Sequence, residues 1–269
     1  LANATLFAGT LASNNGTLDN ITIGSSLNES GTLNVAGNLT LADGVNFNVG
    51  GSSVYFSSAA STIGLAAGAS VATLTHTGYL YSNRSGNNGV VTIGSGVTVA
   101  GSGGLTHYYG GGGWVNNGTI LNNTAGTLTI SPTNFTNNGI LRATAGTTNV
   151  TPTNLTLAAG STLEVAGGTL TIDPTNAWNN LGALTLNSGT LNLGSSFTLA
   201  GMGSYNRTGG TLNVTGVLDL QNSATPLDIG TNGQFGVGGL GTLTGTIRNG
   251  TLVAGADNKT LASNNGTLD

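Results

Sequence analysis

A pentapeptide that begins with glycine returns about every 21 residues through the second half of the chain, an interval typical of stacked repeats. Its five copies start at Gly126, Gly146, Gly168, Gly189 and Gly210, and the steps between them differ by no more than two positions. In most copies apolar residues alternate with Thr or Asn, which is the two-residue period of a strand with one buried face. A strand that recurs at a nearly constant interval restricts the fold to repeat architectures.

Other short motifs keep the same interval. Asn116-Asn-Gly118 returns as Asn137-Asn-Gly139, and glycine or Asn-Gly breaks that favour tight turns separate the strands. No apolar stripe with helical spacing is present. About three short strands in each interval predict an all-β parallel β-helix, or β-solenoid, with about 21 residues per coil and roughly 12 coils. With about 4.8 Å between coils, the rod is expected to be about 60 Å long, with the five glycines in one file along it.

The first half of the chain is less regular. Gly16-Thr-Leu and Gly31-Thr-Leu are separated by less than one coil. Residues 52–114 contain strands but allow no assignment of register, whereas residues 115–220 form the most regular coils. The run Gly110–Gly113 predicts a protruding loop or a distorted coil.

A much longer repeat links the two ends of the sequence. Thr10–Asp19 recurs letter for letter as Thr260–Asp269, and the preceding Ala4–Gly9 is similar to Gly250–Gly255. The second copy carries four additional residues, 256–259, between these blocks, which favours natural duplication. The whole chain is therefore expected to be one β-solenoid segment, about one 250-residue period of a longer tandem array, in which 260–269 begins the next period.

The low content of charge excludes several functions. Charged residues make up 5% of the chain, and its five Lys and Arg residues are scattered with a net charge of -4. Binding to nucleic acid or to anionic lipid needs clustered cations. Low charge suits stacked coils, because identical side chains would lie about 4.8 Å apart in them. The chain has no cysteine. No apolar stretch reaches the length of about 18 residues that a spanning helix needs, so no transmembrane segment is expected.

One pair of opposite charges tests the register of the coils. Arg142 and Glu164 each lie four residues before a glycine of the pentapeptide series. Equivalent positions in neighbouring coils would place the two side chains together as a structural pair. Chance alignment of two isolated charges is the alternative, and an exposed pair contributes less than about 1 kcal/mol.

The sequence offers no catalytic, cofactor-binding or metal site. His76 and His107 are far apart and the acids are scattered singly, whereas a metal needs clustered ligands. Enzymes that cleave polysaccharides on a β-helix need several carboxylates on one face. We therefore expect no enzyme activity and no cofactor, and a polysaccharide-degrading β-helix enzyme is the least favoured function.

Two binding functions stay open. Aromatic residues concentrate before residue 115 and could form a contact surface for glycans, although Tyr and Trp also fill cores. Outward Thr pairs such as Thr127 and Thr129 would suit an ice-binding face, but the high β propensity of Thr explains them equally well. The members of the possible contact surface are Tyr79, Tyr81, His107, Tyr108, Tyr109 and Trp114.

Several strings resemble the β-strand repeats of giant bacterial surface proteins. They include Asn-Asn-Gly-Thr-Ile at 116–120, Gly-Thr-Leu-Asn-Val at 210–214 and the segment Leu155–Val165. The chain looks like filamentous-haemagglutinin-like adhesins and autotransporter passenger domains. This resemblance covers most of the chain, in composition and rhythm.

The resemblance implies a right-handed β-solenoid that is secreted to the cell surface. The function implied is a structural repeat of an extracellular fibre or adhesin, whose partners are further copies of itself, in covalent tandem or head to tail, and possibly surface glycans. The alternative is a carbohydrate- or ice-binding β-solenoid module. No functional residues are carried over, because the family has no catalytic motif to match.

Overall fold

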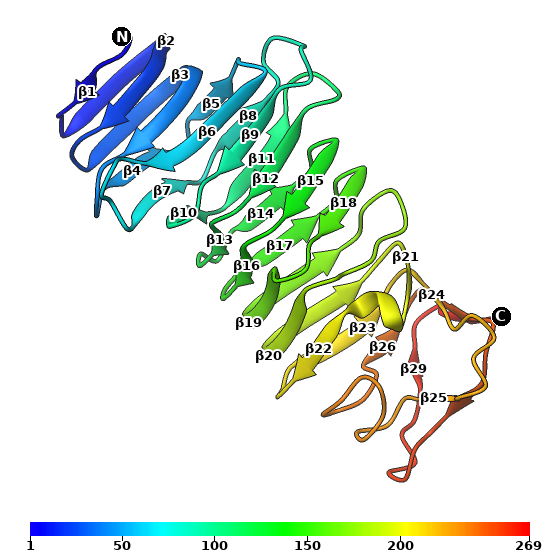
Figure 1. Cartoon of the computed structure of the whole chain (residues 1–269). Coiled ribbons are helices and arrows are strands. Elements are labelled where there is room, and N and C mark those ends of the chain that lie inside the picture. Colours follow the sequence, from blue (N-terminus) through cyan, green and yellow to red (C-terminus); the bar gives the residue numbers. More distant parts are fainter.

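The computed structural model describes residues 1–269 as an all-β parallel β-solenoid of about 13 turns with about 21 residues per turn. The strands stack into a rod, with the N-terminal turns at one end and the C-terminal turns at the other (Figure 1). The predicted fold is confirmed, and the number of turns is close to the expected 12. The single helical element is the 3₁₀ turn η1 (Ala200–Met202), and no helix could cross a membrane.

Each turn crosses three faces, which we number in chain order. The first face carries β4 (Asn46–Gly50), β7 (Ala72–His76), β10 (Val97–Gly101), β13 (Thr119–Asn122), β16 (Ile140–Ala143), β22 (Ser204–Arg207), β25 (Leu227–Asp228) and β28 (Leu252–Val253). The second face carries β5 (Ser53–Phe56), β8 (Tyr79–Ser82), β11 (Gly103–His107), β14 (Thr127–Ile130), β17 (Thr147–Val150), β23 (Thr211–Val214), β26 (Thr242–Leu243) and β29 (Ala262–Ser263).

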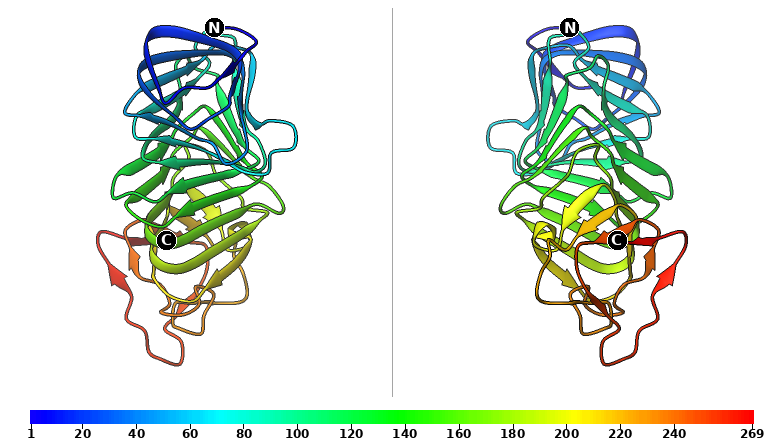
Figure 2. Two further views of the ribbon diagram at one scale, coloured as in Figure 1. Left: turned by 90° about the vertical axis from the view of Figure 1, so that its left-hand side faces the viewer. Right: turned by 90° about the vertical axis from the view of Figure 1, so that its right-hand side faces the viewer.

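The third face and the strands that bend across faces complete the rod (Figure 2). The third face carries β1 (Thr5–Leu6), β6 (Ala60–Leu65), β9 (Val90–Ile93), β12 (Gly113–Asn116), β15 (Asn134–Asn137), β18 (Asn154–Leu157), β21 (Ser196–Thr198), β24 (Val217–Asp219), β27 (Thr246–Arg248) and β30 (Thr267–Leu268). Four long strands span more than one face: β2 (Thr10–Ile23), β3 (Leu27–Leu41), β19 (Thr162–Ile172) and β20 (Ala183–Leu193).

The five repeating glycines lie in one file, as predicted, at the corner before the second face. A Cβ on Gly146 would lie 2.1 Å from the carbonyl oxygen of Gly126, and one on Gly189 would lie 2.3 Å from that of Gly168. Gly146, Gly168, Gly189 and Gly210 also have positive φ. Backbone conformation and close stacking therefore both require glycine at this corner.

Inward residues form one continuous apolar core, while outward amides stack along the rod. Buried Leu, Ile, Val and Phe side chains from Leu18 to Ile247 belong to one cluster, and partly buried residues of the terminal turns pack against it. On the outside, Asn154 Nδ2 donates to Asn134 Oδ1 at 2.9 Å, and Asn176 Nδ2 donates to Asn154 Oδ1 at 2.7 Å. These amide ladders satisfy polar side chains between turns without charge.

The length of a turn varies, and this variation explains the irregular first half. Leu18 pairs with Val35 and Ile63 pairs with Ile93, so the second of these turns is almost twice as long as the first. The extra residues leave the wall as loops, and the ladders continue on either side of them. No register is visible in the sequence before residue 115 because the interval between stacked positions is not constant there.

The two copies of the duplicated segment build the same corner. Asn15 and Asn265 have φ of 56° and 59°. In the first copy the amide of Asp19 donates to the carbonyl oxygen of Leu1 at 2.8 Å, and in the second copy the amide of Asp269 donates to that of Ile247 at 3.0 Å. The identical sequence therefore makes the same corner and the same rung at both ends of the rod.

The second copy is displaced by one face relative to the first. Leu18 lies on the second face, and Leu268 lies on the third. Eleven ladder steps lead along the second face from Leu18 to the strand just before Leu268, through β3, β5, β8, β11, β14, β17, β19, β20, β23, β26 and β29. One period of the duplication therefore equals eleven turns and one face.

Candidate functional site

Five tyrosines gather on and beside the second face, where β5 and β8 stack. Tyr55 and Tyr81 are ladder partners, and their rings stack with centroids 4.8 Å apart and an angle of 8° between the planes. Tyr79, two residues before Tyr81 on β8, leans onto it at 5.6 Å and 22°. Tyr108 and Tyr109 follow β11. We call these five residues the tyrosine cluster.

A guanidinium group sits within the tyrosine cluster. Arg84 Cζ lies 4.2 Å from the ring centroid of Tyr108 and 4.7 Å from that of Tyr55. The Tyr108 ring stands edge-on to Tyr55 and to Tyr81, at 5.3 and 5.9 Å. Contacts of a cation with ring faces at these distances are attractive, so they orient Arg84 against the wall of the rod.

A buried amide holds the two loops of the cluster together. Asn83 is fully buried and has φ of 57°. Its Nδ2 donates to the carbonyl oxygens of Tyr109 and Gly110, at 2.9 and 2.8 Å, and its Oδ1 accepts from the amide of Gly89 at 3.1 Å. The glycine-rich loop after Tyr109 is therefore fixed onto the loop that carries Arg84.

The polar groups of the cluster are free to meet a ligand. Neither the guanidinium of Arg84 nor any hydroxyl of the five tyrosines makes a hydrogen bond to the protein. Exposed fractions are 49% for Tyr79, 42% for Tyr108 and 51% for Tyr109. Burial, and then the neighbouring Tyr55, raise the pKa of Tyr81.

The prediction that Trp114 belongs to a contact surface is wrong. Trp114 is 1% exposed, its ring stands edge-on to Phe56 at 5.9 Å, and its Nε1 donates to the carbonyl oxygen of Thr106 at 2.8 Å. Its ladder partners are Val91 and Phe135 in the apolar column. His107 ends β11 beside this corner, half-buried, with Nδ1 lacking a hydrogen-bond partner.

The structure brings Arg142 and Glu164 together. They are partners in the ladder between β16 and β19, and Arg142 Nε lies 3.1 Å from Glu164 Oε2. Their side chains are 46% and 21% exposed. At this exposure the pair contributes less than about 1 kcal/mol. Glu164 also accepts from Asn187 Nδ2 at 3.2 Å, so the pair belongs to the outer polar ladder.

The other titratable groups do not assemble into a reactive site. His76 is buried on the first face, which lowers its pKa to about 4, and its Nδ1 lies 3.2 Å from the carbonyl oxygen of Gly78. No group of three or more His, Asp or Glu residues lies close enough to hold a metal ion. The imidazole therefore stays neutral at neutral pH and has no acid beside it.

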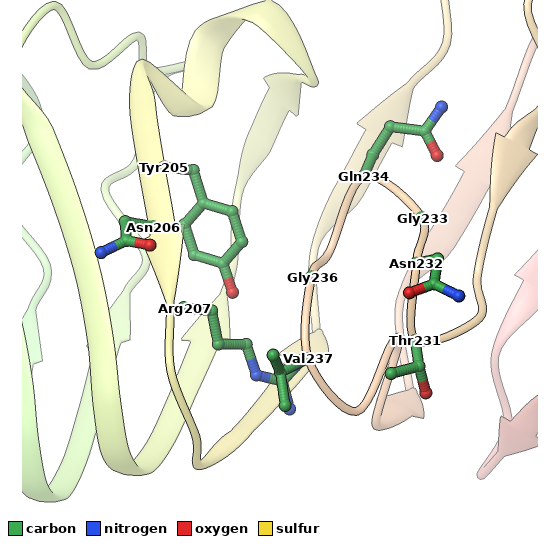
Figure 3. Close-up of a pocket in the computed structure, with 9 residues that line it drawn as sticks. All are labelled: Tyr205, Asn206, Arg207, Thr231, Asn232, Gly233, Gln234, Gly236 and Val237. Atoms are coloured by element: carbon green, nitrogen blue, oxygen red, sulfur yellow. The ribbon is translucent and has the colours of Figure 1, made fainter.

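The largest loop covers a pocket of about 380 Å³ near the C-terminal end. Arg207 lines it and is 8% exposed. The guanidinium donates to the carbonyl oxygens of Gly209, Phe235, Gly239 and Gly210 at 2.6 to 3.2 Å. Figure 3 shows the side chains of Tyr205 and Arg207 on β22 directed toward the loop 231–237, whereas Asn206 points to the other side of the strand.

These contacts give Arg207 a structural role. Four of its five N–H groups bind backbone carbonyls, two in the loop and two in the corner that follows β22. Arg207 thereby fastens the long loop onto β22, and no carboxylate lines the pocket. Sequence analysis missed this residue, although a signal was available: Arg207 lies three residues before Gly210, as the inward Leu186 lies three residues before Gly189.

The outward threonines do not form two continuous rows. One row stacks threonine in five successive turns. The neighbouring row mixes threonine with asparagine, and its amides bond within the row: Asn213 donates to Asn192 and Asn192 donates to Thr171, at 2.9 and 3.2 Å. The first row is Thr127, Thr147, Thr169, Thr190 and Thr211, and the second is Thr129, Asn149, Thr171, Asn192 and Asn213.

Comparison with known proteins returns no similarity that would assign a function. No protein-family model matches the chain, and neither a curated protein nor a solved structure matches it. The fold and the geometry of its surface therefore carry the functional conclusion.

Proposed function

We propose that the chain is a structural, non-catalytic repeat of a long extracellular fibre or cell-surface adhesin, whose periods stack end to end through continuous β-solenoid pairing. The observation that carries this proposal is the common corner of the two copies of the duplicated segment. Each copy turns at its second Asn with positive φ and closes the same backbone rung. A rod whose turns repeat this way can be prolonged by the same sequence without a change of geometry.

Burial in the two copies supports the same proposal. Leu18 is 4% exposed because β3 covers it, with Val35 as its ladder partner. Leu268, its counterpart, is 56% exposed. A further turn that repeats the sequence after Asp19 would place the counterpart of Val35 over Leu268. A turn with the sequence of the one that covers Leu18 would therefore also cover Leu268.

The mechanical basis is the ladder of backbone hydrogen bonds on the three faces, together with one continuous aliphatic core. Each turn is held by its neighbours through main-chain bonds that do not depend on charge. Low charge also avoids repulsion between equivalent side chains about 4.8 Å apart. The extracellular location rests on the compositional resemblance to bacterial surface proteins. Covalent tandem repetition is favoured over head-to-tail association because the duplication lies within one chain.

A chain of two periods tests the proposal. Residues 20–269 would be appended directly after Asp269, and the product compared with the single segment by small-angle scattering and hydrogen exchange. We expect one rod, longer by about 54 Å from eleven turns and one face at about 4.8 Å per turn. The amide of Leu268 should become as protected as that of Leu18. Two rods joined by a flexible hinge would refute continuous stacking, and absence of the native protein from the surface of intact cells would refute the extracellular role.

A further inference from the structure

The tyrosine cluster surrounds the one formal charge in a long uncharged part of the rod. Arg84 is the only Lys, Arg, Asp or Glu between Asp43 and Arg142. The ion pairs of the protein involve Arg142 and Arg248, whereas Arg84 has no acidic partner. A fixed cation that lacks an acidic partner, in a stretch with no other formal charge, favours an anionic group at this place.

The contacts of Arg84 define which anion fits. Cζ lies over the Tyr108 and Tyr55 rings at 4.2 and 4.7 Å, and these rings stand at 83° to each other, so the planar guanidinium can lie flat against only one of them. The N–H groups of Arg84 that do not meet a ring lack a protein acceptor and are open to a ligand. Two parallel N–H groups in one plane match the two oxygens of a carboxylate.

The surroundings add hydroxyl groups and ring edges. The five tyrosine hydroxyls make no hydrogen bond to the protein, and Tyr79 and Tyr109 are about half exposed. Stacking within the cluster occupies much of the ring area, so a ligand would meet hydroxyls and ring edges along an open surface. Such a surface suits an extended polyhydroxylated chain that makes several weak contacts in succession.

The rigidity of the two loops that carry Arg84, Tyr108 and Tyr109 favours binding at the tyrosine cluster. Asn83 ties the loop of Arg84 to the loop of Tyr108 and Tyr109 by three hydrogen bonds. Fixed loops lose little conformational entropy when a ligand binds. We propose that the tyrosine cluster and Arg84 bind the carboxylate groups of an acidic polysaccharide of the uronic acid class. This inference does not depend on stacking between periods.

The experiment titrates the whole chain with a hexasaccharide of galacturonate, followed by NMR shifts of the backbone amides. Saturable shifts are expected for residues 83–89 and 108–112, with a millimolar dissociation constant. The fully methyl-esterified hexasaccharide has the same sugar rings without charge, and should bind at least tenfold more weakly. Added salt should weaken only the binding of the charged hexasaccharide.

Two variants with the same change in net charge separate a site from general attraction. Arg84→Gln should weaken binding at least tenfold, whereas Arg142→Gln, an exposed arginine on the first face, should change it less than twofold. Tyr108→Phe, which removes one hydroxyl and keeps the ring, should weaken it a few-fold. Thermal melting of each variant confirms that the rod is intact.

The proposal fails under any of three results. These are no saturable shift up to 20 mM hexasaccharide, equal binding of the methyl ester, or equal loss of binding in Arg84→Gln and Arg142→Gln. None of these results bears on whether two periods stack, so the two proposals fail independently.

Discussion

The ten-residue segment Thr10–Asp19 and its second copy, Thr260–Asp269, have the same sequence, but a following turn covers only the first copy. The first copy lies within one continuous strand, β2, whereas the second forms the two-residue strands β29 and β30. Both copies turn at the second Asn with positive φ. Local sequence therefore determines the corner, while the neighbouring turn determines the length of the strand and the burial of its side chains.

The largest difference in the stability cost of a substitution is expected between the matched leucines of the two copies, Leu18 and Leu268. Leu18→Ala removes a side chain that β3 covers and should lower the free energy of unfolding by about 3 kcal/mol. Leu268→Ala removes a side chain that is 56% exposed, and should cost less than about 0.5 kcal/mol. Urea unfolding of both variants measures the difference. In the two-period chain the two costs should become equal, and a persistent difference would show that no turn covers Leu268 there.

Acid should weaken the turns around His76, which lie nearer to the first copy, and spare the second copy. The unfolded chain protonates His76 near pH 6.5, whereas burial lowers the folded pKa to about 4. Stability is therefore lost as the pH falls from 6.5 to 4, by up to about 3 kcal/mol, and this loss levels off below pH 4. Hydrogen exchange at pH 7 and pH 4.5, corrected for intrinsic rates, should show reduced protection in β4, β7 and β10.

His76→Gln provides the control for this pH dependence, because its side chain does not titrate. The variant should lose the decrease between pH 6.5 and 4, although it is less stable throughout. An unchanged decrease would mean that other groups cause it. The amide of Asp269, on the second copy, should respond equally in both proteins.

Substitution of the corner glycine should cost more stability in the second copy than in the first, which is the reverse of the order expected for the leucines. A Cβ on Gly266 would lie 2.5 Å from Leu243 in the turn beneath, whereas one on Gly16 would meet only Ser13 Cβ, at 3.7 Å. Gly266→Ala should cost about 2 kcal/mol through overpacking, and Gly16→Ala close to nothing. Thermal melting measures both. Equal costs would mean that the turn beneath does not constrain the corner.

The smallest loss of stability is expected for substitutions of the corner asparagines, and it should be the same in both copies. Asn15 and Asn265 hold positive φ, so Asn→Ala at either position should cost about 1 kcal/mol, and Asn→Gly should be nearly neutral. Equilibrium unfolding of the four variants tests this expectation. A cost confined to one copy would show that the corner depends on its neighbours and is not set locally.

The regular part of the rod is predictable from sequence because one corner requires glycine in every turn. That requirement keeps the interval nearly constant from Gly126 to Gly210 and fixes the register in which Arg142 meets Glu164. In the first half glycine also recurs at this corner, where Gly103 stacks on Gly78, but the interval is not constant: the turn from Leu18 to Val35 is little more than half as long as that from Ile63 to Ile93. Loops that leave the wall change the interval without changing the stack, so the register is invisible there.

The members of the tyrosine cluster were only partly predictable. The motif Asn116-Asn-Gly118 aligns with Asn137-Asn-Gly139, and extending this alignment by two residues pairs Trp114 with Phe135 in the core column. That signal was available and would have removed Trp114 from the surface. Tyr55 and Arg84 had no comparable signal, because Tyr55 stacks on Tyr81 within the irregular turns, where no motif marks equivalent positions.

The offset of one face between the two copies has a consequence for any array of such periods. Successive periods would be related by a threefold screw, with a translation of about 54 Å and a rotation of about one third of a revolution. The tyrosine cluster would then point in a new direction in each period and return to its original azimuth after three. Whatever the orientation of such a fibre about its own axis, every third cluster would face a surface that the fibre lies against. Several weak contacts could therefore form at once.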